Sequence, residues 1–337
     1  MRVVYLNPSA QMGGAEVALL DFLASLREAE PNWRLHLIVS DEGPVVVKAR
    51  ALGVNTAVVP FPRSLARLGD SSVGGPAGRQ QSRLALIAGI VLAAPGIVAY
   101  VKRLRRAIRN WAPDLVHTNG FKMHIMGAWA VPRAVPLIWH IHDYVSARPL
   151  MARLLRRYSS RCALALANSE SVAADLQTVC GDGLQVKTIY NGINLESFSP
   201  QGPTLDLDAL SGLPPANSDT IRVGMLATMA RWKGHDVFLR AMALIPADLP
   251  VRGYIAGGPI YQTNGSQHSL EELKRQINQL GLSERVGLTG FIDNPSAAMR
   301  ALDIVVHASD RRSGLACRPD RSRSLTGLTG LATRTVC

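Results

Sequence analysis

Short runs of β-branched and aliphatic residues alternate with segments of helical periodicity along most of the chain. In the first 198 residues seven such runs are predicted strands: 3–6, 35–40, 57–60, 114–117, 137–141, 163–167 and 186–190. The helix expected after the first strand carries Val17, Leu20 and Leu23 on one face. Because strands that alternate with helices of crossover length form parallel sheets, this half is predicted to be a doubly wound α/β domain.

The same rhythm starts again after a break in the pattern. Four further strands are predicted over 222–226, 251–256, 286–289 and 304–307, and a helix with a Ser269–Glu272 capping box ends at Gly281. Between 199 and 220 the periodicity disappears and Pro, Gly, Ser and Asp accumulate, as in linkers. We therefore expect a Rossmann-like domain over 1–198, a linker over 199–220, and a second, incomplete Rossmann-like domain over 221–309. Their strands should end at a shared cleft.

One apolar segment, 84–101, carries no charged side chain, and it is followed directly by the basic run Lys102, Arg103, Arg105, Arg106 and Arg109. A single membrane span here would cut through one continuous domain, and Gly89, Pro95 and Gly96 interrupt the segment, so we expect a helix pair that is buried or dips into a membrane. Apolar surface beside clustered cations suits anionic lipid headgroups, which favours peripheral attachment through 84–109. A core helix with a solvated basic end is the alternative.

Composition narrows the classes of protein further. The chain has 337 residues and a net charge of +12, of which a third comes from 310–337, where six Arg face two Asp. No recognition motif and few aromatic residues accompany the basic runs, so no nucleic-acid partner is expected. The four cysteines form no CxxC pair and no zinc spacing, so no metal site is predicted. Met1 and Arg2 lead into an apolar run too short for a signal peptide, which predicts a cytoplasmic protein.

Two loops at predicted strand ends in the first half carry candidate chemistry. Gly13 and Gly14 stand between the first strand and its helix, where free N–H groups favour an anion; a plain tight turn is the alternative, because the pattern is not GxGxxG. His140, His142 and Asp143 end the fifth strand, and alternation places both imidazoles on one face. Such a pair could hydrogen-bond a sugar or shuttle a proton, although isolated histidines are more often core or surface residues.

In the second half, Arg231 and Lys233 lie in the first loop between a strand and a helix. Two cations beside the free N–H groups of a helix N-terminus would bind a diphosphate, whereas a solvated loop is the alternative interpretation.

Several motifs together resemble the GT-B glycosyltransferases, and within them the large family 4 of retaining enzymes that use nucleotide sugars. The resemblance covers Met1 to about Ser309, and it rests on GGAE at 13–16, PDLVHTNG at 113–120, HIHD at 140–143, ANSESVAADL at 167–176, YNGINLESF at 190–198, ARWKGHDVFLRA at 230–241, GGP at 257–259 and LTGFIDN at 288–294.

This resemblance implies a UDP- or GDP-sugar held by the second domain, a polysaccharide or lipid-linked glycan acceptor bound by the first, and no metal or other cofactor. It implies that Lys233 contacts the donor phosphates and that His142, with His140, acts at the reacting sugar. The donor site would further include Gly13, Gly14, Arg231 and Gly258, and the acceptor side or the framework would include Glu16, Asp143 and Asn191. The enzyme would work at the cytoplasmic face of the plasma membrane.

Two positions depart from the family pattern. Thr228 stands where members often have an arginine, so Arg231 is the candidate substitute. No glutamate follows Glu284, although members carry two glutamates eight positions apart after the strand that ends here at His307. We therefore expect residues 310–337 to be a disordered or out-of-frame tail. A catalytically inactive, truncated fragment is the alternative to an active transferase.

Overall fold

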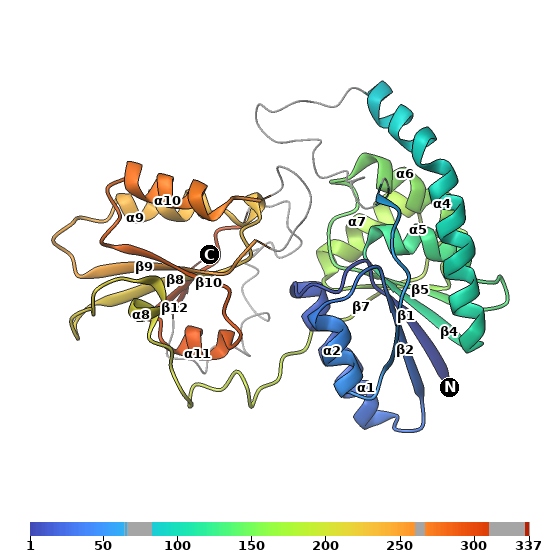
Figure 1. Ribbon diagram of the computed structural model, residues 1–337, viewed down its shortest axis with the longest axis horizontal. Coiled ribbons are helices and arrows are strands. Elements are labelled where there is room, and N and C mark those ends of the chain that lie inside the picture. The colour runs from blue at the N-terminus through green and yellow to red at the C-terminus, as the bar shows by residue number, and fades with distance from the viewer. Residues whose placement is uncertain (64, 66–82, 260–266, 310–333, 337) are drawn as a thin grey trace. The chain divides into compact units, whose positions relative to one another are not determined.

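The computed structural model divides the chain into two units, Met1–Gly192 and Ile193–Cys337. It describes residues 1–63, 65, 83–259, 267–309 and 334–336, and for 83–93 and 334–336 the backbone alone. Each unit is built on one parallel β-sheet that is covered by helices on both faces (Figure 1).

The first unit contains a seven-stranded sheet in the order β3-β2-β1-β4-β5-β6-β7, and every pairing is parallel. Its strands are β1 (Arg2–Leu6), β2 (Arg34–Val39), β3 (Asn55–Val58), β4 (Leu115–Asn119), β5 (Leu137–Ile141), β6 (Leu164–Ala167) and β7 (Val186–Thr188). Its helices are α1 (Gly14–Ala29), α2 (Pro44–Ala51), α4 (Arg83–Trp111), α5 (Phe121–Ala130), α6 (Pro149–Tyr158) and α7 (Glu170–Cys180). The seven strands predicted from the sequence are confirmed.

Alternation along the strands builds a core on each face of this sheet. Val3 and Tyr5 of β1 point to the layer formed by α1 and α2, where Leu23 is fully buried. Val4 and Leu6 point to the other layer, which contains Tyr100 and Trp139 and is covered by α4 to α7. A strand that is buried on both faces is apolar at nearly every position, which is why these runs were visible in the sequence.

The second unit contains the sheet β10-β9-β8-β11-β12, also parallel throughout. Its strands are β8 (Ile221–Leu226), β9 (Val251–Ala256), β10 (Val286–Gly290), β11 (Ile304–Val306) and β12 (Arg334–Val336). Its helices are α8 (Leu207–Ser211), α9 (His235–Ala243), α10 (Leu270–Gln279) and α11 (Pro295–Arg300). The Ser269 side chain accepts a hydrogen bond from the Glu272 N–H, so α10 begins as the capping box predicts.

Two expectations about these segments differ from the structure. The expected helix pair is instead one helix, α4, with Pro95 inside it; a proline removes one helical hydrogen bond and does not by itself end a helix. The expected linker contains α8, whose Leu207 and Asp208 are buried against the second sheet, because a five-residue helix is too short to show periodicity. No described helix is long and apolar enough to cross a membrane.

The expected tail also contributes to the sheet. Residues 310–333 and 337 lie outside the described part of the chain, but 334–336 form β12, which pairs in parallel with β11. Pairing of strands uses main-chain N–H and C=O groups, so the composition of this segment gave no sign of it.

Candidate active site residues in the two units

In the first unit the strand order reverses between β1 and β4, and ligands of open α/β sheets bind outside the carboxyl ends of the strands at such a point. The loop that follows β1 leads into α1, which begins after Gly13 without any side-chain cap. A Cβ on Gly14 would meet no atom of the described residues within 4 Å, so this part of the first turn of α1 is open. The structure therefore places Gly13 and Gly14 where an anion could approach main-chain N–H groups.

Glu16 occupies part of this helix start. Its carboxylate accepts a hydrogen bond of 3.1 Å from Asn7 Nδ2. Burial raises the pKa of Glu16 most strongly, while hydrogen bonds from Asn7 and from main-chain groups at Glu16 and Gly13 act in the opposite direction. Glu16 thus supports the loop between β1 and α1 through its hydrogen bond with Asn7.

A row of aromatic and imidazole rings crosses the carboxyl ends of three strands. The ring centroids are 5.1 Å apart for Tyr5 and His117, 5.4 Å for His117 and His140, and 4.1 Å for His140 and His142. Register brings this about, because Tyr5 pairs with His117 on neighbouring strands and His140 lies two residues before His142. The structure therefore brings the two predicted histidines together and adds His117 to them.

Burial keeps these imidazoles neutral near pH 7. Burial, with a smaller contribution from neighbouring imidazoles, lowers the pKa of His117 to about 3 and that of His140 to about 2. Burial also lowers the pKa of His142, although the adjacent Asp143 acts in the opposite direction. Neutral imidazoles can donate and accept hydrogen bonds, which suits recognition of hydroxyl groups.

Several buried polar atoms at this edge have no partner among the described residues. They are Asn7 Oδ1, Asn119 Oδ1 and the Nε2 atoms of His117, His140 and His142. Buried polar atoms are usually hydrogen-bonded, so this cluster is where a polar ligand or water molecules would be held. Asn7, Asn119 and His117 were missed from the sequence, although Asn7 directly follows β1 and Asn119 ends β4.

Two other predicted residues lie apart from this cluster. Asp143 pairs with Arg148 at 3.6 Å, and its side chain is half exposed. Asn191 is exposed in the segment just before the first unit ends, and no described contact joins it to the histidines. The structure thus gives Asp143 an electrostatic connection to His142 and gives Asn191 none.

In the second unit the strand order reverses between β8 and β11, and the start of α9 lies at that point. Arg231–Lys233 form a short 3-10 helix, and Gly234 then caps α9 with φ 78°. A Cβ on Gly234 would lie 2.0 Å from the main-chain oxygen of Ala308, so this loop is packed directly against the end of β11. Lys233 and the free N–H groups of α9 therefore share one position at the edge of the sheet.

His307, at the end of β11, completes this edge. Burial lowers its pKa, and the charge of the nearby Lys233 lowers it further. Its Nε2 lies 3.2 Å from Ser309 Oγ. Gly258 follows β9, and its carbonyl accepts a hydrogen bond of 3.1 Å from the Met229 N–H. Lys233, Gly258 and His307 thus lie in loops at the carboxyl ends of the strands of one sheet, and His307 was not among the predicted site residues.

Arg231 points to α10. Its guanidinium donates two hydrogen bonds of 2.9 Å to the carboxylate of Glu272 and approaches His268 Nδ1 at 3.3 Å. Burial tends to raise the pKa of Glu272, but the hydrogen bonds and charges of Arg231 and His268 outweigh it and lower that pKa. Thr228 Oγ1, at the departure from the family pattern, is buried and has no partner among the described residues. Any contact of Arg231 with a donor would compete with Glu272.

Among the described residues, no group of three or more His, Cys, Asp and Glu side chains is placed to hold a metal ion.

Two parallel, doubly wound sheets in separate units, each with candidate ligand groups at its strand reversal, form the GT-B fold. The family profile described as Glycosyltransferase Family 4 matches residues 12–197, more than half of the chain, and the profile described as Glycosyl transferases group 1 matches 220–318. The chain belongs to Glycosyltransferase Family 4. The second match continues past Ser309, where the sequence was expected to leave the fold.

Individual relatives agree with this assignment. The D-inositol 3-phosphate glycosyltransferase of Jonesia denitrificans is 26% identical over 246 residues, which are 65% of this chain and 56% of that enzyme. The chain therefore spans about half the length of this curated relative.

Solved structures show the same fold. HepE of Anabaena in complex with UDP and glucose has a TM-score of 0.66 at 23% identity, covering 92% of this chain and 74% of that one. The lipopolysaccharide outer core galactosyltransferase WaaB has a TM-score of 0.57 at 11% identity, and the match covers 92% of this chain and 74% of WaaB. At these identities the likeness concerns the fold alone.

Proposed function

We propose that this protein transfers a sugar from a nucleotide-sugar donor to a glycan or lipid-linked acceptor, with retention of the anomeric configuration. The observation that carries the proposal is the position of Lys233 beside the N-terminus of α9 at the strand reversal of the second sheet. A cation and free N–H groups at that point suit a nucleoside diphosphate. The HepE structures, which contain UDP, UDP and glucose, or UDP-glucose, support a donor of this class.

The chemistry follows from charge. As the bond between the anomeric carbon and the diphosphate breaks, the acceptor hydroxyl oxygen bonds to that carbon and its proton passes to the leaving phosphate. Negative charge grows on this phosphate during the step, and Lys233 with the α9 N–H groups would stabilise it. Groups held in place before the reaction need little reorganisation, so this electrostatic contribution is the largest that we assign to the protein. This proposal assigns no role to a metal ion.

The first unit would bind the acceptor and contact the donor sugar. Its buried imidazoles are neutral near pH 7, and their Nε2 atoms have no partner among the residues that the structure describes, so His142, with His140 behind it, can hydrogen-bond sugar hydroxyl groups. We place the acceptor at the inner face of the plasma membrane, as a polysaccharide or lipid-linked glycan. Attachment of the protein there would be peripheral, through the basic half of α4.

A donor screen tests this function. The full chain is incubated with UDP- and GDP-sugars and with candidate acceptors, released nucleoside diphosphate is measured, and the anomeric configuration of the product is read by NMR. We expect release with one donor class and a product of retained configuration. Inversion would contradict retention, and no release with any donor would contradict the transferase.

A second candidate is a chain that binds donor without turning it over. Residues 285–337 favour it, because they contain neither of the two glutamates that the family resemblance places after the strand ending at His307. Donor binding without nucleoside diphosphate release, in the presence of acceptors, distinguishes this candidate from the active enzyme.

A further inference from the structure

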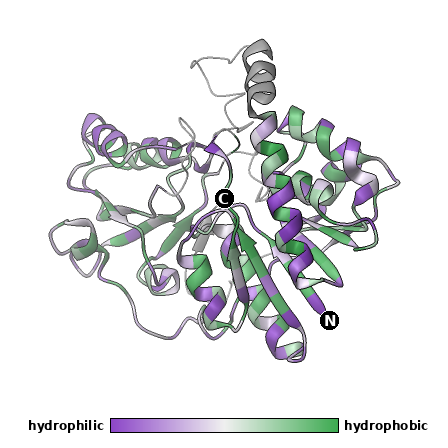
Figure 2. Cartoon of the chain, turned by 45° about the vertical axis from the view of Figure 1, so that its right-hand side comes forward, coloured by the Kyte–Doolittle hydropathy of each residue, from purple (hydrophilic) through white to green (hydrophobic). Residues whose placement is uncertain are grey.

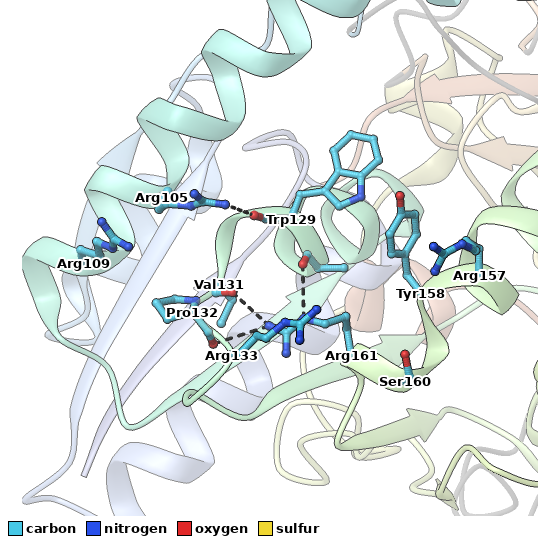
Figure 3. A pocket seen from close by; sticks show the side chains of 11 residues that line it. Arg105, Arg109, Trp129, Val131, Pro132, Arg133, Arg157, Tyr158, Ser160 and Arg161 are labelled. Atoms are coloured by element: carbon cyan, nitrogen blue, oxygen red, sulfur yellow. Dashed lines mark hydrogen bonds between the residues drawn. The ribbon is translucent and has the colours of Figure 1, made fainter.

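One hollow on the described surface of the first unit lies far from the histidines. It measures about 520 Å³ and is formed by the ends of α4, α5 and α6 together with the segments that lead into β5 and β6 (Figure 3). These segments lie at the amino ends of the strands, whereas the histidines lie at the carboxyl ends. A five-residue strand is roughly 16 Å long, so the hollow is separate from the candidate active site.

Among the described residues that line this hollow, none is acidic and five are arginines: Arg105, Arg109, Arg133, Arg157 and Arg161. Within the described residues, none of them forms an ion pair with a carboxylate. Five like charges around one hollow repel each other, and a bound anion would relieve this repulsion.

Two of the five arginines have a structural role. Arg105 donates to the main-chain oxygen of Trp129 at 2.5 Å, and Arg161 donates to that of Val131 at 3.0 Å. These carbonyl groups belong to the C-terminal end of α5, where cations satisfy unpaired acceptors. Arg105 and Arg161 therefore hold the wall of the hollow together.

The other three, Arg109, Arg133 and Arg157, are exposed. In the part of the chain that the structure describes, no hydrogen bond or ion pair engages Arg109 or Arg133, and Arg157 lies over the Tyr158 ring at 5.5 Å. Their guanidinium groups come from α4, from the segment before β5, and from α6, and they line the same space (Figure 3). Planar guanidinium forks of this kind suit phosphate oxygens.

A second, apolar hollow adjoins the first. It measures about 210 Å³, is lined by Ile97, Val98, Val101 and Lys102, and shares Arg105 and Trp129 with the arginine hollow. Val98 is 55% exposed, and Figure 2 shows apolar and polar residues side by side along α4. A phosphate site that is continuous with exposed apolar surface and a half-buried Trp matches an amphiphile better than a soluble anion.

We propose that Arg109, Arg133 and Arg157 bind the headgroup phosphate of an anionic phospholipid, while Ile97, Val98, Val101 and Trp129 contact the acyl region of the bilayer. The inference rests on the peripheral membrane attachment proposed above and assigns a site to it. It does not depend on donor, acceptor or turnover.

The test compares two triple variants of the full chain. R109Q/R133Q/R157Q removes the lining charges, and R106Q/R153Q/R156Q removes three exposed arginines from α4 and α6 that do not line the hollow. Both variants change the net charge equally. Binding is measured by co-sedimentation with phosphatidylcholine vesicles and with vesicles that also contain phosphatidylglycerol. Inorganic phosphate alone is titrated in parallel while the melting temperature is followed.

We expect binding to the anionic vesicles only. Because each basic residue near such a surface changes binding roughly five-fold, the lining variant should lose about a hundred-fold and the control variant less than ten-fold. Should the triple variant not fold, R133Q alone, at an exposed loop position, should lose about five-fold. Equal losses of vesicle binding in both triple variants would overturn the site, because the binding would then depend on the overall positive charge. Stabilisation by phosphate without vesicle binding would overturn the lipid in favour of a soluble anion.

The result is independent of the proposed function. If the vesicle pattern is as expected and no donor is turned over, the site stands and the transferase does not. If turnover occurs with soluble acceptors and vesicle binding is absent, the transferase stands and the lipid site does not.

Discussion

Gly234 fixes the start of α9 against the end of β11, and its replacement by alanine would separate these two elements. The residue has φ 78°, which costs an L-residue about 1–2 kcal/mol. A Cβ would also lie 2.0 Å from the main-chain oxygen of Ala308. Since C···O contacts are about 3.3 Å or longer, the first turn of α9 would have to move by about 1.3 Å.

Lys233 and the N–H groups of α9 move with this turn, so G234A should affect both stability and donor binding. We expect the second unit to lose about 3 kcal/mol of unfolding free energy, from the left-handed φ together with the backbone overlap. Donor affinity should fall at least ten-fold, because misplacement by about 1 Å is costly at a preorganised site. Hydrogen exchange of peptides from β8 and β9 measures the stability, and calorimetry with UDP- and GDP-sugars measures the affinity.

Gly281 provides the matched control. It also has a left-handed φ, 67°, but a Cβ there would meet no atom of the described residues within 4 Å. G281A should therefore cost only the conformational part, about 1 kcal/mol, and should leave donor affinity unchanged. If G234A destabilised the second unit no more than G281A and bound donor normally, the contact between Gly234 and the end of β11 would not position the start of α9.

Three further predictions concern charged and titratable groups. E272Q removes the carboxylate that holds Arg231, so donor affinity should stay the same or rise. R231A should lower donor affinity about ten-fold, which corresponds to about 1.4 kcal/mol. Unchanged donor affinity in R231A would show that Arg231 does not belong to the donor site. D208A breaks the buried contact of Asp208 with Arg252 and should lower the free energy of unfolding, measured in urea, by about 3 kcal/mol. The exposed D236A should lower it by about 0.5 kcal/mol. Equal losses would contradict the packing of α8 against the second sheet through Asp208. The pKa of His117 is about 3 when folded and about 6.5 when unfolded, so the unfolded chain binds more protons between these values. Stability should fall as pH drops through this range, by up to about 1.4 kcal/mol per pH unit, and H117Q should show a shallower slope in urea unfolding at several pH values.

The sheets were readable from the sequence because buried parallel strands are apolar at almost every position. The run 137–141 coincides with β5, and the run 251–256 with β9. The misses have different causes. Pro95 suggested a break that the helix tolerates, α8 is too short for periodicity, and β12 pairs through its main chain.

The candidate site was predictable only where residues stand beside a recognisable motif. His140 and His142 end a visible strand, and Lys233 precedes a visible helix. Asn7 and His117 needed the strand order, because only the pairing of β1 with β4 brings them to one edge. The Arg231–Glu272 pair joins residues 41 positions apart, and nothing in local spacing announces such a contact.

Binding of nucleoside diphosphates by calorimetry tests the central proposal most directly. Lys233 is compared with Lys274, an exposed lysine on α10 of the same unit. We expect the native chain and K274A to bind UDP or GDP alike, and K233A to bind at least ten-fold more weakly. Equal affinity of K233A and K274A, or no binding of either nucleotide to the native chain, would contradict it.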